Sequence, residues 1–486
     1  MSRRSVVLLV VAAVAVAVAG VVLSCGADES ASPASTTAVP TTEATTTTIT
    51  GEPGADGVGD PYFPALGNGG YDVSHYTLQL TWLPDDGSLA GTTTIEATAT
   101  QDLSRFNLDL SGLEVISVEV DGVAASTGRT GRELQVTPSA PIAAGRAFTA
   151  VVSYAGRPEP VSEGTDLFEV GWRTDGREAF VVSEPSGAAT FYPVNDHPTD
   201  KATYTVEVTA PADQTVAASG LLTGQVDAGA GQRRWTYEAR DPMASYLLQI
   251  AIGDLELVDG GAAGSVTIRH AFHRSLADAA RVTVARTAEM IDVLDDVYGP
   301  FPFEAYGVLA VDEDLGFALE TQTLTIVGSD LASSGRRADD ILVHELAHQW
   351  VGNSVSPATW KDIWLNEGFA TYSEWLWSER TGGSSAAARA RSFAGSGGLS
   401  LPPGDPGSAE LFHRSVYRRG GMTLQALREA IGDQAFFTVL ARWVDDHRGG
   451  AASTTDFVAL AEDVSGQELD DLFQRWLYGD RLPSLG

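Results

Sequence analysis

The pattern of apolar residues changes near residue 260, and this change constrains the fold more than any other feature of the sequence. Between about residues 62 and 260, apolar and polar residues alternate in short runs such as Tyr76–Trp82 and Tyr204–Val208, with Gly, Pro and Asp between the runs. A period of two is typical of half-buried strands. From residue 277 onward, apolar residues recur mainly at helical spacing, apart from a strand pair expected around residues 306–327.

These patterns predict a multidomain α+β protein. We expect an N-terminal β-sandwich over residues 61–260 and a mixed α/β domain with a helical tail over residues 261–486. A chain of 486 residues is too long for a single core, which also favours several domains. The sequence contains one cysteine, so no internal disulfide can form, and packing and any bound metal must provide the stability.

The first 24 residues are typical of an export signal. Arg3 and Arg4 precede an almost unbroken apolar run that ends at Leu23. The residues Val-Leu-Ser-Cys that end at Cys25 resemble the lipobox of bacterial lipoproteins, in which the signal is cleaved before a cysteine that then carries lipid. We therefore expect a signal peptide over residues 1–24 and a lipid anchor at Cys25. An uncleaved N-terminal membrane anchor is the alternative, because the apolar run is about long enough to span a bilayer.

A flexible linker is expected over residues 25–60, after the anchor. This segment consists mainly of Thr, Ser, Pro, Ala and Gly and has too few large apolar residues to form a core. The expected location is therefore outside the cytoplasm, either attached to the cell membrane or secreted. The formal net charge of −33 disfavours nucleic acid and anionic lipid headgroups as partners.

Two histidines one helical turn apart form the first part of a predicted metal site. His344 and His348 stand four residues apart in the run His-Glu-Leu-Ala-His-Gln-Trp. On an α-helix such residues lie about 40° apart around the axis and about 6 Å apart along it, so both imidazoles can bind one ion. Glu345 can reach a metal-bound water without being a ligand itself. We therefore predict one Zn²⁺ per chain, with Glu345 as the general base.

The third ligand distinguishes between classes of zinc hydrolase. A metzincin has glycine at the third place and histidine at the sixth place after its second motif histidine, but Val351 and Ser354 stand there. Glu367 follows His348 after 18 intervening residues, which leaves room for a helix end, a loop and the start of a second helix. We therefore expect Glu367 to be the third ligand.

Glu374 and Asn366 are predicted neighbours of the ligands. Glu374 stands seven residues after Glu367, and seven helical steps of about 100° return to within about 20° of the same face. Its carboxylate can therefore accept a hydrogen bond from a ligand imidazole. A solvent-exposed helix acid is the alternative for Glu374. Asn366 directly precedes Glu367 and is expected beside the metal site.

These residues resemble the signature of the aminopeptidase N family of gluzincin zinc metallopeptidases. In that signature, His-Glu-x-x-His is followed after 18 residues by a glutamate in a run like Asn-Glu-Gly-Phe-Ala, and residues 366–370 have this sequence. The resemblance extends over residues 59–485. It implies a saddle-like N-terminal β-domain, a thermolysin-like catalytic domain and a helical C-terminal segment, and we expect no counterpart of the large C-terminal helical domain of longer relatives.

The resemblance also implies residues that bind the substrate. Residues 316–322, Gly-Phe-Ala-Leu-Glu-Thr-Gln, resemble the family's Gly-Ala-Met-Glu-Asn strand, which pairs with the substrate backbone. By this match Glu320 binds the free α-amino group of the substrate, and Ala318 contacts the substrate. Phe317 and Thr321 stand where the family has glycine and asparagine, so strict exopeptidase action is less firmly implied than hydrolysis.

Two further residues are implied only by the resemblance. Residues 183–201 contain runs similar to a family segment that ends in a lysine, and the match makes Glu184 the second amine-binding acid. Val182 replaces the usual glutamine, and the alternative for Glu184 is a structural acid at a domain interface. Residues 416–421 resemble the family's Tyr-x-Lys-Gly element, which implies that Tyr417 donates a hydrogen bond to the developing oxyanion. A core tyrosine is the alternative.

The expected function is that of a zinc-dependent aminopeptidase. Such an enzyme would hydrolyse peptides that have a free N-terminus, through a metal-activated water and outside the cytoplasm. A thermolysin-like endopeptidase would use the same zinc site, and one branch of the resembled family hydrolyses an epoxide. A non-catalytic surface binding protein stabilised by zinc is the third possibility, although all ligands and the base are present.

Overall fold

The structure is a computed structural model that describes residues 50–162, 169–395 and 397–485. The predicted signal peptide, Cys25 and most of the predicted linker lie outside these residues. Within the described part of the chain, no helix combines the length and the apolar character that crossing a membrane requires.

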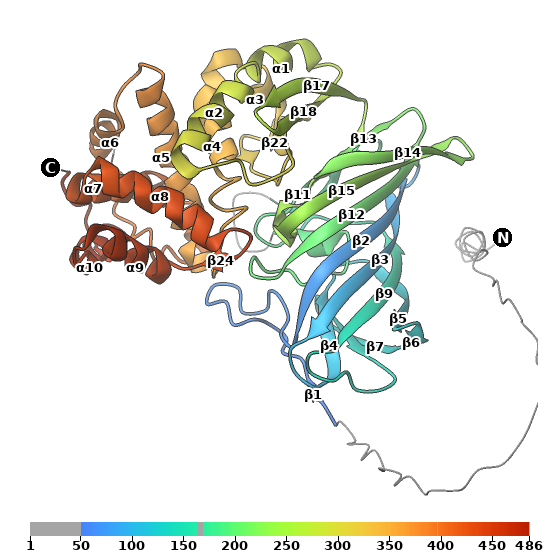
Figure 1. Ribbon diagram of the computed structural model, residues 1–486. Helices are drawn as coiled ribbons and strands as arrows, with labels where there is room; N and C mark the ends of the chain where they lie inside the picture. The colour runs from blue at the N-terminus through green and yellow to red at the C-terminus, as the bar shows by residue number, and fades with distance from the viewer. Residues whose placement is uncertain (1–49, 163–168, 396, 486) are drawn as a thin grey trace, which may run out of the picture. The chain divides into compact units, whose positions relative to one another are not determined.

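An eight-stranded sheet is the largest element of the N-terminal domain (Figure 1). In spatial order its strands are β14 (Leu221–Gly229), β15 (Gln232–Ala244), β12 (Lys201–Pro211), β2 (Tyr71–Leu83), β3 (Ser88–Ala99), β9 (Ala147–Gly156), β5 (Glu114–Val120) and β6 (Val123–Ala124). Alternate residues of β12 are buried, as the period of two predicts. Tyr204 of β12 stands opposite Tyr76 of β2, and the two rings stack with their centroids 5.1 Å apart.

Two four-stranded sheets complete the domain. One consists of β1 (Glu52–Pro53), β4 (Leu103–Asp109), β8 (Glu133–Thr137) and β7 (Ser126–Thr130). The other consists of β10 (Gly171–Thr174), β11 (Ala179–Val182), β16 (Ile250–Gly253) and β13 (Thr215–Ala218). The predicted β-sandwich is confirmed, and the end of β11 leads directly to Glu184.

The packed structure begins before the predicted linker boundary at residue 60. Strand β1 pairs in parallel with β4, and Asp60 is 2% exposed. The Asp60 carboxylate accepts hydrogen bonds from the backbone N–H of Tyr62 at 2.8 Å and of Trp360 at 2.8 Å. The composition of residues 50–60 predicted a linker, but a buried carboxylate that satisfies backbone donors attaches this segment to the core. The flexible linker expected over residues 25–60 therefore does not include residues 52–60.

The second domain contains a mixed sheet that begins earlier than predicted. Its strands are β17 (Leu255–Ala263), β18 (Val266–His273), β20 (Val308–Ala310), β22 (Thr325–Val327) and β21 (Ala318–Leu319), and β19 (Ala305–Tyr306) also pairs with β18. Because β17 belongs to this sheet, the mixed sheet begins at Leu255, before the expected domain start at residue 261. β21 is an edge strand, paired on one side with β22.

Helices make up most of the second domain (Figure 1). They are α1 (Ala277–Thr283), α2 (Thr287–Tyr298), α3 (Ser329–Ala332), α4 (Asp339–Ala347), α5 (Trp364–Arg380), α6 (Ala386–Ala394), α7 (Arg414–Ile431), α8 (Asp433–His447), α9 (Thr454–Ser465) and α10 (Asp470–Phe473). Gly432, with a φ of +80°, ends α7 and separates it from α8. The short strands β23 (Ser356–Pro357) and β24 (Ala451–Ala452) join the loop before α5 to the loop before α9.

α5 and α7 touch through their backbones. A Cβ atom added at Gly368 of α5 would lie 2.9 Å from the carbonyl carbon of Gly420 of α7, which is closer than real Cβ contacts. The two glycines therefore permit a helix crossing that larger residues would prevent. This crossing places the first turns of α7, with Tyr417, next to α5, which carries Glu367.

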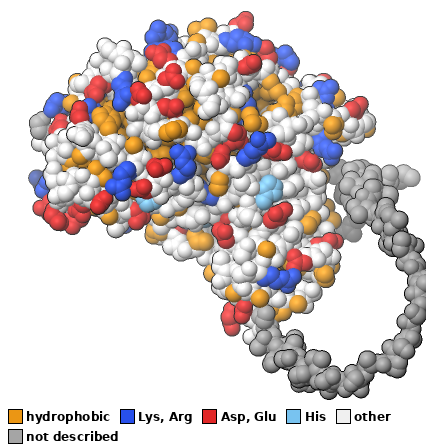
Figure 2. Space-filling view, viewed as in Figure 1, with side chains coloured by type: hydrophobic (Ala, Val, Ile, Leu, Met, Phe, Trp, Pro, Cys, Tyr) orange, Lys and Arg blue, Asp and Glu red, His pale blue; other side chains and the backbone are white. Residues whose placement is uncertain are grey.

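The surface is charged and mixed. Figure 2 shows acidic and basic side chains interspersed over the visible face. In the whole sequence 64 acidic residues exceed 31 basic ones, so the protein is strongly acidic. Charges of both signs on one face keep apolar surface from forming large continuous areas.

Candidate active site

The three predicted metal ligands converge. His344 lies in the last turn of α4, His348 directly follows that helix, and Glu367 lies in the first turn of α5. Glu367 Oε2 is 3.1 Å from His344 Nε2 and 3.6 Å from His348 Nε2. All three residues are buried, and one ligand atom from each lies within 4.8 Å of the others. Two imidazoles and one carboxylate are the donor set of a catalytic zinc site, so the residues present fit this ion.

Hydrogen bonds and charge order the ligands. His344 Nδ1 is 2.8 Å from Glu374 Oε1, which is the contact expected from the helical spacing of Glu374 and Glu367. His348 Nδ1 is 3.2 Å from the carbonyl oxygen of Val351. Burial opposes ionisation of Glu367, but His348 and His344 lower the pKa of its carboxyl to about 2.

Glu345 lies next to the ligands without belonging to them. One carboxylate oxygen of Glu345 lies within 4.8 Å of ligand atoms of His348 and Glu320. The side chain is 5% exposed, and burial raises the pKa of Glu345 to about 8, although the two histidines oppose this shift. A carboxyl group with a raised pKa beside a metal site can both accept and donate a proton near neutral pH.

Glu320 and Ala318 line the same pocket as the metal ligands. Ala318 belongs to the edge strand β21, and Glu320 follows that strand directly. Glu320 Oε1 is 3.8 Å from His348 Nδ1, and the side chain is 3% exposed. Because β21 has a neighbouring strand on one side only, its other side can pair with an extended peptide.

Glu184 reaches the same pocket from the N-terminal domain. Its side chain is 3% exposed, and a carboxylate oxygen lies within 4.8 Å of oxygens of Glu320 and Glu367. Burial, together with the negative charges of these acids, raises the pKa of Glu184 well above its usual range. The structure thus places both predicted amine-binding acids beside the metal ligands.

Tyr417 packs directly on a ligand. Its ring stacks on the imidazole of His344 with the ring centroids 5.8 Å apart and an angle of 19° between the planes. Burial raises the pKa of Tyr417 well above its usual range, and the charges of Glu367 and Glu184 act in the same direction. The phenol therefore stays protonated and can donate a hydrogen bond.

Asn366 is buried beside the ligands through an unusual backbone position. A Cβ atom added at Gly352, whose φ is +120°, would lie 3.2 Å from Asn366 Nδ2 and 3.2 Å from His348 Nδ1. Gly352 therefore allows the chain after α4 to pass close to both side chains. Asn366 therefore lies beside the ligand His348, where it was expected, and is 1% exposed.

The metal ligands line a pocket of about 370 Å³ together with Glu345, Glu374, Glu184, Ala318, Glu320 and Tyr417. Apolar side chains that were not predicted also line it, among them Phe412 and Ile341. Phe412 comes from the loop before α7, and Ile341 is an exposed residue of α4. Single apolar residues at ordinary spacing carry no sequence signal that could have identified them.

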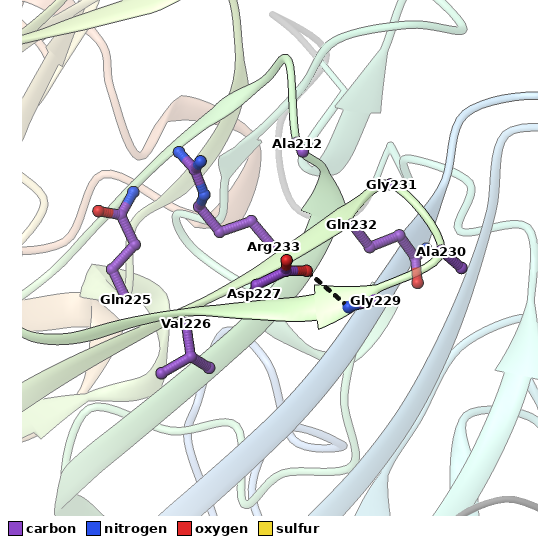
Figure 3. A pocket seen from close by; sticks show the side chains of 9 residues that line it. All are labelled: Ala212, Gln225, Val226, Asp227, Gly229, Ala230, Gly231, Gln232 and Arg233. Atoms are coloured by element: carbon purple, nitrogen blue, oxygen red, sulfur yellow. Dashed lines mark hydrogen bonds between the residues drawn. The ribbon is translucent and has the colours of Figure 1, made fainter.

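A second hollow, of about 440 Å³, lies at the turn between β14 and β15 (Figure 3). There the Asp227 carboxylate accepts a hydrogen bond from the N–H of Gly229 at 2.8 Å (Figure 3). The residues that line this hollow include neither histidine nor cysteine. The pocket around His344 and His348 is therefore the candidate active site.

Two family models match the chain. The model described as the Peptidase M1 N-terminal domain matches residues 72–247, and the model described as the Peptidase family M1 domain matches residues 282–396 and 404–476. The first match covers most of the β-domain. The second match contains the three metal ligands, Glu345 and Tyr417.

Solved structures are similar to the same two domains. The chain is 37% identical to the M1 zinc metallopeptidase from Deinococcus radiodurans, whose crystal structure aligns with a TM-score of 0.82 over 88% of this chain and 98% of that one. The structure of yeast LTA4 hydrolase, 20% identical, aligns with a TM-score of 0.71 over 86% of this chain and 69% of that one, which shows a shared fold.

Aminopeptidase M1 of Arabidopsis thaliana is 25% identical over 315 residues, which is 60% of this chain and 36% of that protein. The chain spans between about a third and a half of the length of the curated relatives it matches, 36% to 51% in the individual alignments. Three findings support one family: the two matched domains, the similarity to nearly the whole Deinococcus structure, and the converging metal ligands. The chain belongs to the M1 family of zinc metallopeptidases.

Proposed function

We propose that this chain is an aminopeptidase that removes N-terminal residues from peptides. The observation that carries the proposal is the pair of buried carboxylates, Glu184 and Glu320, beside the zinc ligands. Within the described residues, Oε1 of each has no hydrogen-bond partner. A buried carboxylate oxygen without a hydrogen bond is costly, and the ammonium group of a free N-terminus would provide a positive charge and the missing donors.

Relatives support a peptide substrate. Several curated relatives are named aminopeptidases, among them the proteins from Arabidopsis thaliana and Candida albicans. A mutant of the M1 zinc metallopeptidase from Deinococcus radiodurans has been solved with a Tyr-Ser-Ala substrate, and a mutant of a two-domain M1 zinc metallopeptidase has been solved with L-tryptophan and with L-arginine. Each of these ligands has a free α-amino group, as the acids of this pocket would require.

The residues of the pocket divide the work of hydrolysis between them. When bound, zinc polarises the scissile carbonyl and lowers the pKa of a water molecule. Glu345 accepts the proton of the attacking water and passes it to the leaving amine. Tyr417 donates a hydrogen bond to the carbonyl oxygen as its negative charge grows. Glu184 and Glu320 hold the ammonium group, so that the first peptide bond lies at the metal ligands.

A pair of peptides tests the proposal. The zinc-loaded protein is expected to hydrolyse a tripeptide with a free amino group with a kcat/KM about a hundredfold higher than that for its N-acetylated form, because acetylation removes the charge and leaves two buried acids unpaired. Rates are measured by separating the products by chromatography. Glu320→Gln is the control variant, and it should lower the ratio of kcat/KM for the free tripeptide to kcat/KM for the N-acetylated one.

The outcomes distinguish the alternatives. Equal rates on both peptides would favour the endopeptidase, which uses the same zinc site and needs no free amino group. If zinc-loaded, folded protein hydrolysed neither peptide, nor any member of a peptide library, peptidase activity itself would be contradicted.

We further propose that the chain works outside the cytoplasm. The support comes from Arg3, Arg4, the apolar run after them and Cys25. Cys25→Ser is expected to abolish incorporation of labelled fatty acid and to shift the protein out of the membrane fraction of expressing cells. The assignment of the label is direct because the chain has one cysteine. A variant that stayed in the membrane fraction would favour the uncleaved anchor over the lipid.

A further inference from the structure

Lys201, the first residue of β12 in the N-terminal domain, reaches the loop that follows the zinc-binding helix. Its Nζ donates hydrogen bonds to the carbonyl oxygens of Asn353 at 2.8 Å, Ser354 at 2.9 Å and Gly450 at 3.0 Å. All three acceptors belong to the second domain. One amine therefore fixes two loops of the catalytic domain to the N-terminal domain.

Asn353 connects this contact to the active site. Its backbone N–H donates to the carbonyl oxygen of the ligand His348 at 2.9 Å, and its side-chain Nδ2 donates to the carbonyl oxygen of Glu320 at 2.7 Å. The side chain is fully buried. The same carbonyl of Glu320 accepts a second hydrogen bond from Gln349 Nε2 at 2.9 Å. The backbone of Glu320 is thus held by two amides from the segment just after His348.

We infer that Lys201 is a positioning residue that holds Glu320 in place through Asn353. The inference rests on the proposed function, in which Glu320 binds the amino group of the substrate. Lys201 fixes the carbonyl of Asn353, the orientation of Asn353 fixes the backbone of Glu320, and this backbone sets where the Glu320 carboxylate points. The arrangement gives the N-terminal domain two contributions to amine binding, the carboxylate of Glu184 and the amine of Lys201.

The other lysine of the chain does not share this role. Only two lysines are present, and the other, Lys361, lies on the surface with its Nζ 3.1 Å from Asp405. A long, flexible side chain that ends in a compact amine can point its donors at three converging carbonyl oxygens, whereas a neutral apolar residue would leave all three buried without that donor.

Lys201→Met is expected to raise KM for a free-amine tripeptide about tenfold, the effect of losing one favourable hydrogen bond in the site, and to change kcat by less than about threefold. Zinc content should stay at one ion per chain, because none of the ligand side chains is altered. Lys361→Met is the matched control and should leave KM unchanged. If Lys201→Met does not fold, Lys201→Gln, which keeps two donors, is measured in the same way.

A double-mutant comparison separates positioning from simple stabilisation of the fold. Asn353→Ala removes the link between Lys201 and Glu320 and should itself raise KM. Adding Lys201→Met to Asn353→Ala should then raise KM by less than about twofold further, because both changes interrupt one chain of contacts. A loss of thermal stability alone, without this dependence of KM, is what a purely structural role would produce.

Several results would overturn the inference. These are an unchanged KM in folded Lys201→Met, a multiplied KM effect in the double variant, or a loss of zinc that accounts for the lower activity. The proposed function is tested separately by the wild-type preference for free over N-acetylated peptide. If that preference is present while the KM of Lys201→Met is normal, the inference about Lys201 alone is wrong.

Discussion

Glu345→Gln is expected to lower kcat by about 10² to 10⁴, the range for loss of a general acid–base residue. Glutamine keeps the size of the side chain and one acceptor oxygen, but it cannot accept or deliver a proton near neutral pH. Glu345 lies within 4.8 Å of ligand atoms of His348 and Glu320 and is not one of the three zinc ligands. Zinc content, measured by atomic absorption, should therefore remain at one ion per chain.

The matched control for this variant is Glu184→Gln, which removes a carboxylate from the same pocket. Because Glu184 is assigned to binding the substrate amine, its loss should act mainly on KM, whereas the loss of Glu345 should act mainly on kcat. Normal turnover by zinc-loaded Glu345→Gln would show that another group moves the proton.

Tyr417→Phe is expected to lower kcat by about 10² to 10³, the effect of removing one hydrogen-bond donor from a developing oxyanion. The ring stacks on His344, so phenylalanine should keep this packing while removing the hydroxyl group. KM should change little, because the hydrogen bond strengthens as the carbonyl oxygen gains charge in the transition state.

Steady-state kinetics of Tyr417→Phe beside Tyr62→Phe tests this prediction. The hydroxyl of Tyr62 donates to Asp405 at 2.6 Å and does not line the pocket, so its loss controls for the removal of a phenol elsewhere in the chain. Equal, small effects in both variants would assign Tyr417 to packing against His344, which is the core-tyrosine alternative.

The zinc site could be predicted from the sequence because its geometry is local. A step of four residues from His344 to His348, and a step of seven residues from Glu367 to Glu374, each return to nearly the same face of a helix. These four side chains therefore meet once the two helices are adjacent. The positions of Glu320, Glu184 and Tyr417 came instead from a family resemblance. These three residues lie far apart in the sequence, so helix or strand periodicity cannot predict that they line one pocket.

The features that sequence reasoning missed depend on contacts between distant segments. Lys201 and Asn353 are separated by 152 positions, and a single lysine at the start of a strand does not indicate a partner in another domain. The early start of the packed structure has a similar cause, since Asp60 is held by the N–H of Trp360, 300 positions later. The expected boundary at residue 260 falls inside β17 (Leu255–Ala263), because a strand-like pattern identifies a strand and not the sheet that contains it.

The contact between Gly368 and Gly420 limits how this active site can be redesigned. Since a Cβ atom at either glycine would lie 2.9 Å from the backbone of the other helix, a substitution at either position would push the helices apart. Tyr417 would then move away from the metal-binding residues together with its whole helix. A wider pocket for bulkier substrates is therefore better obtained by shortening apolar side chains that line it, such as Phe317 or Ile341, than by changing this crossing.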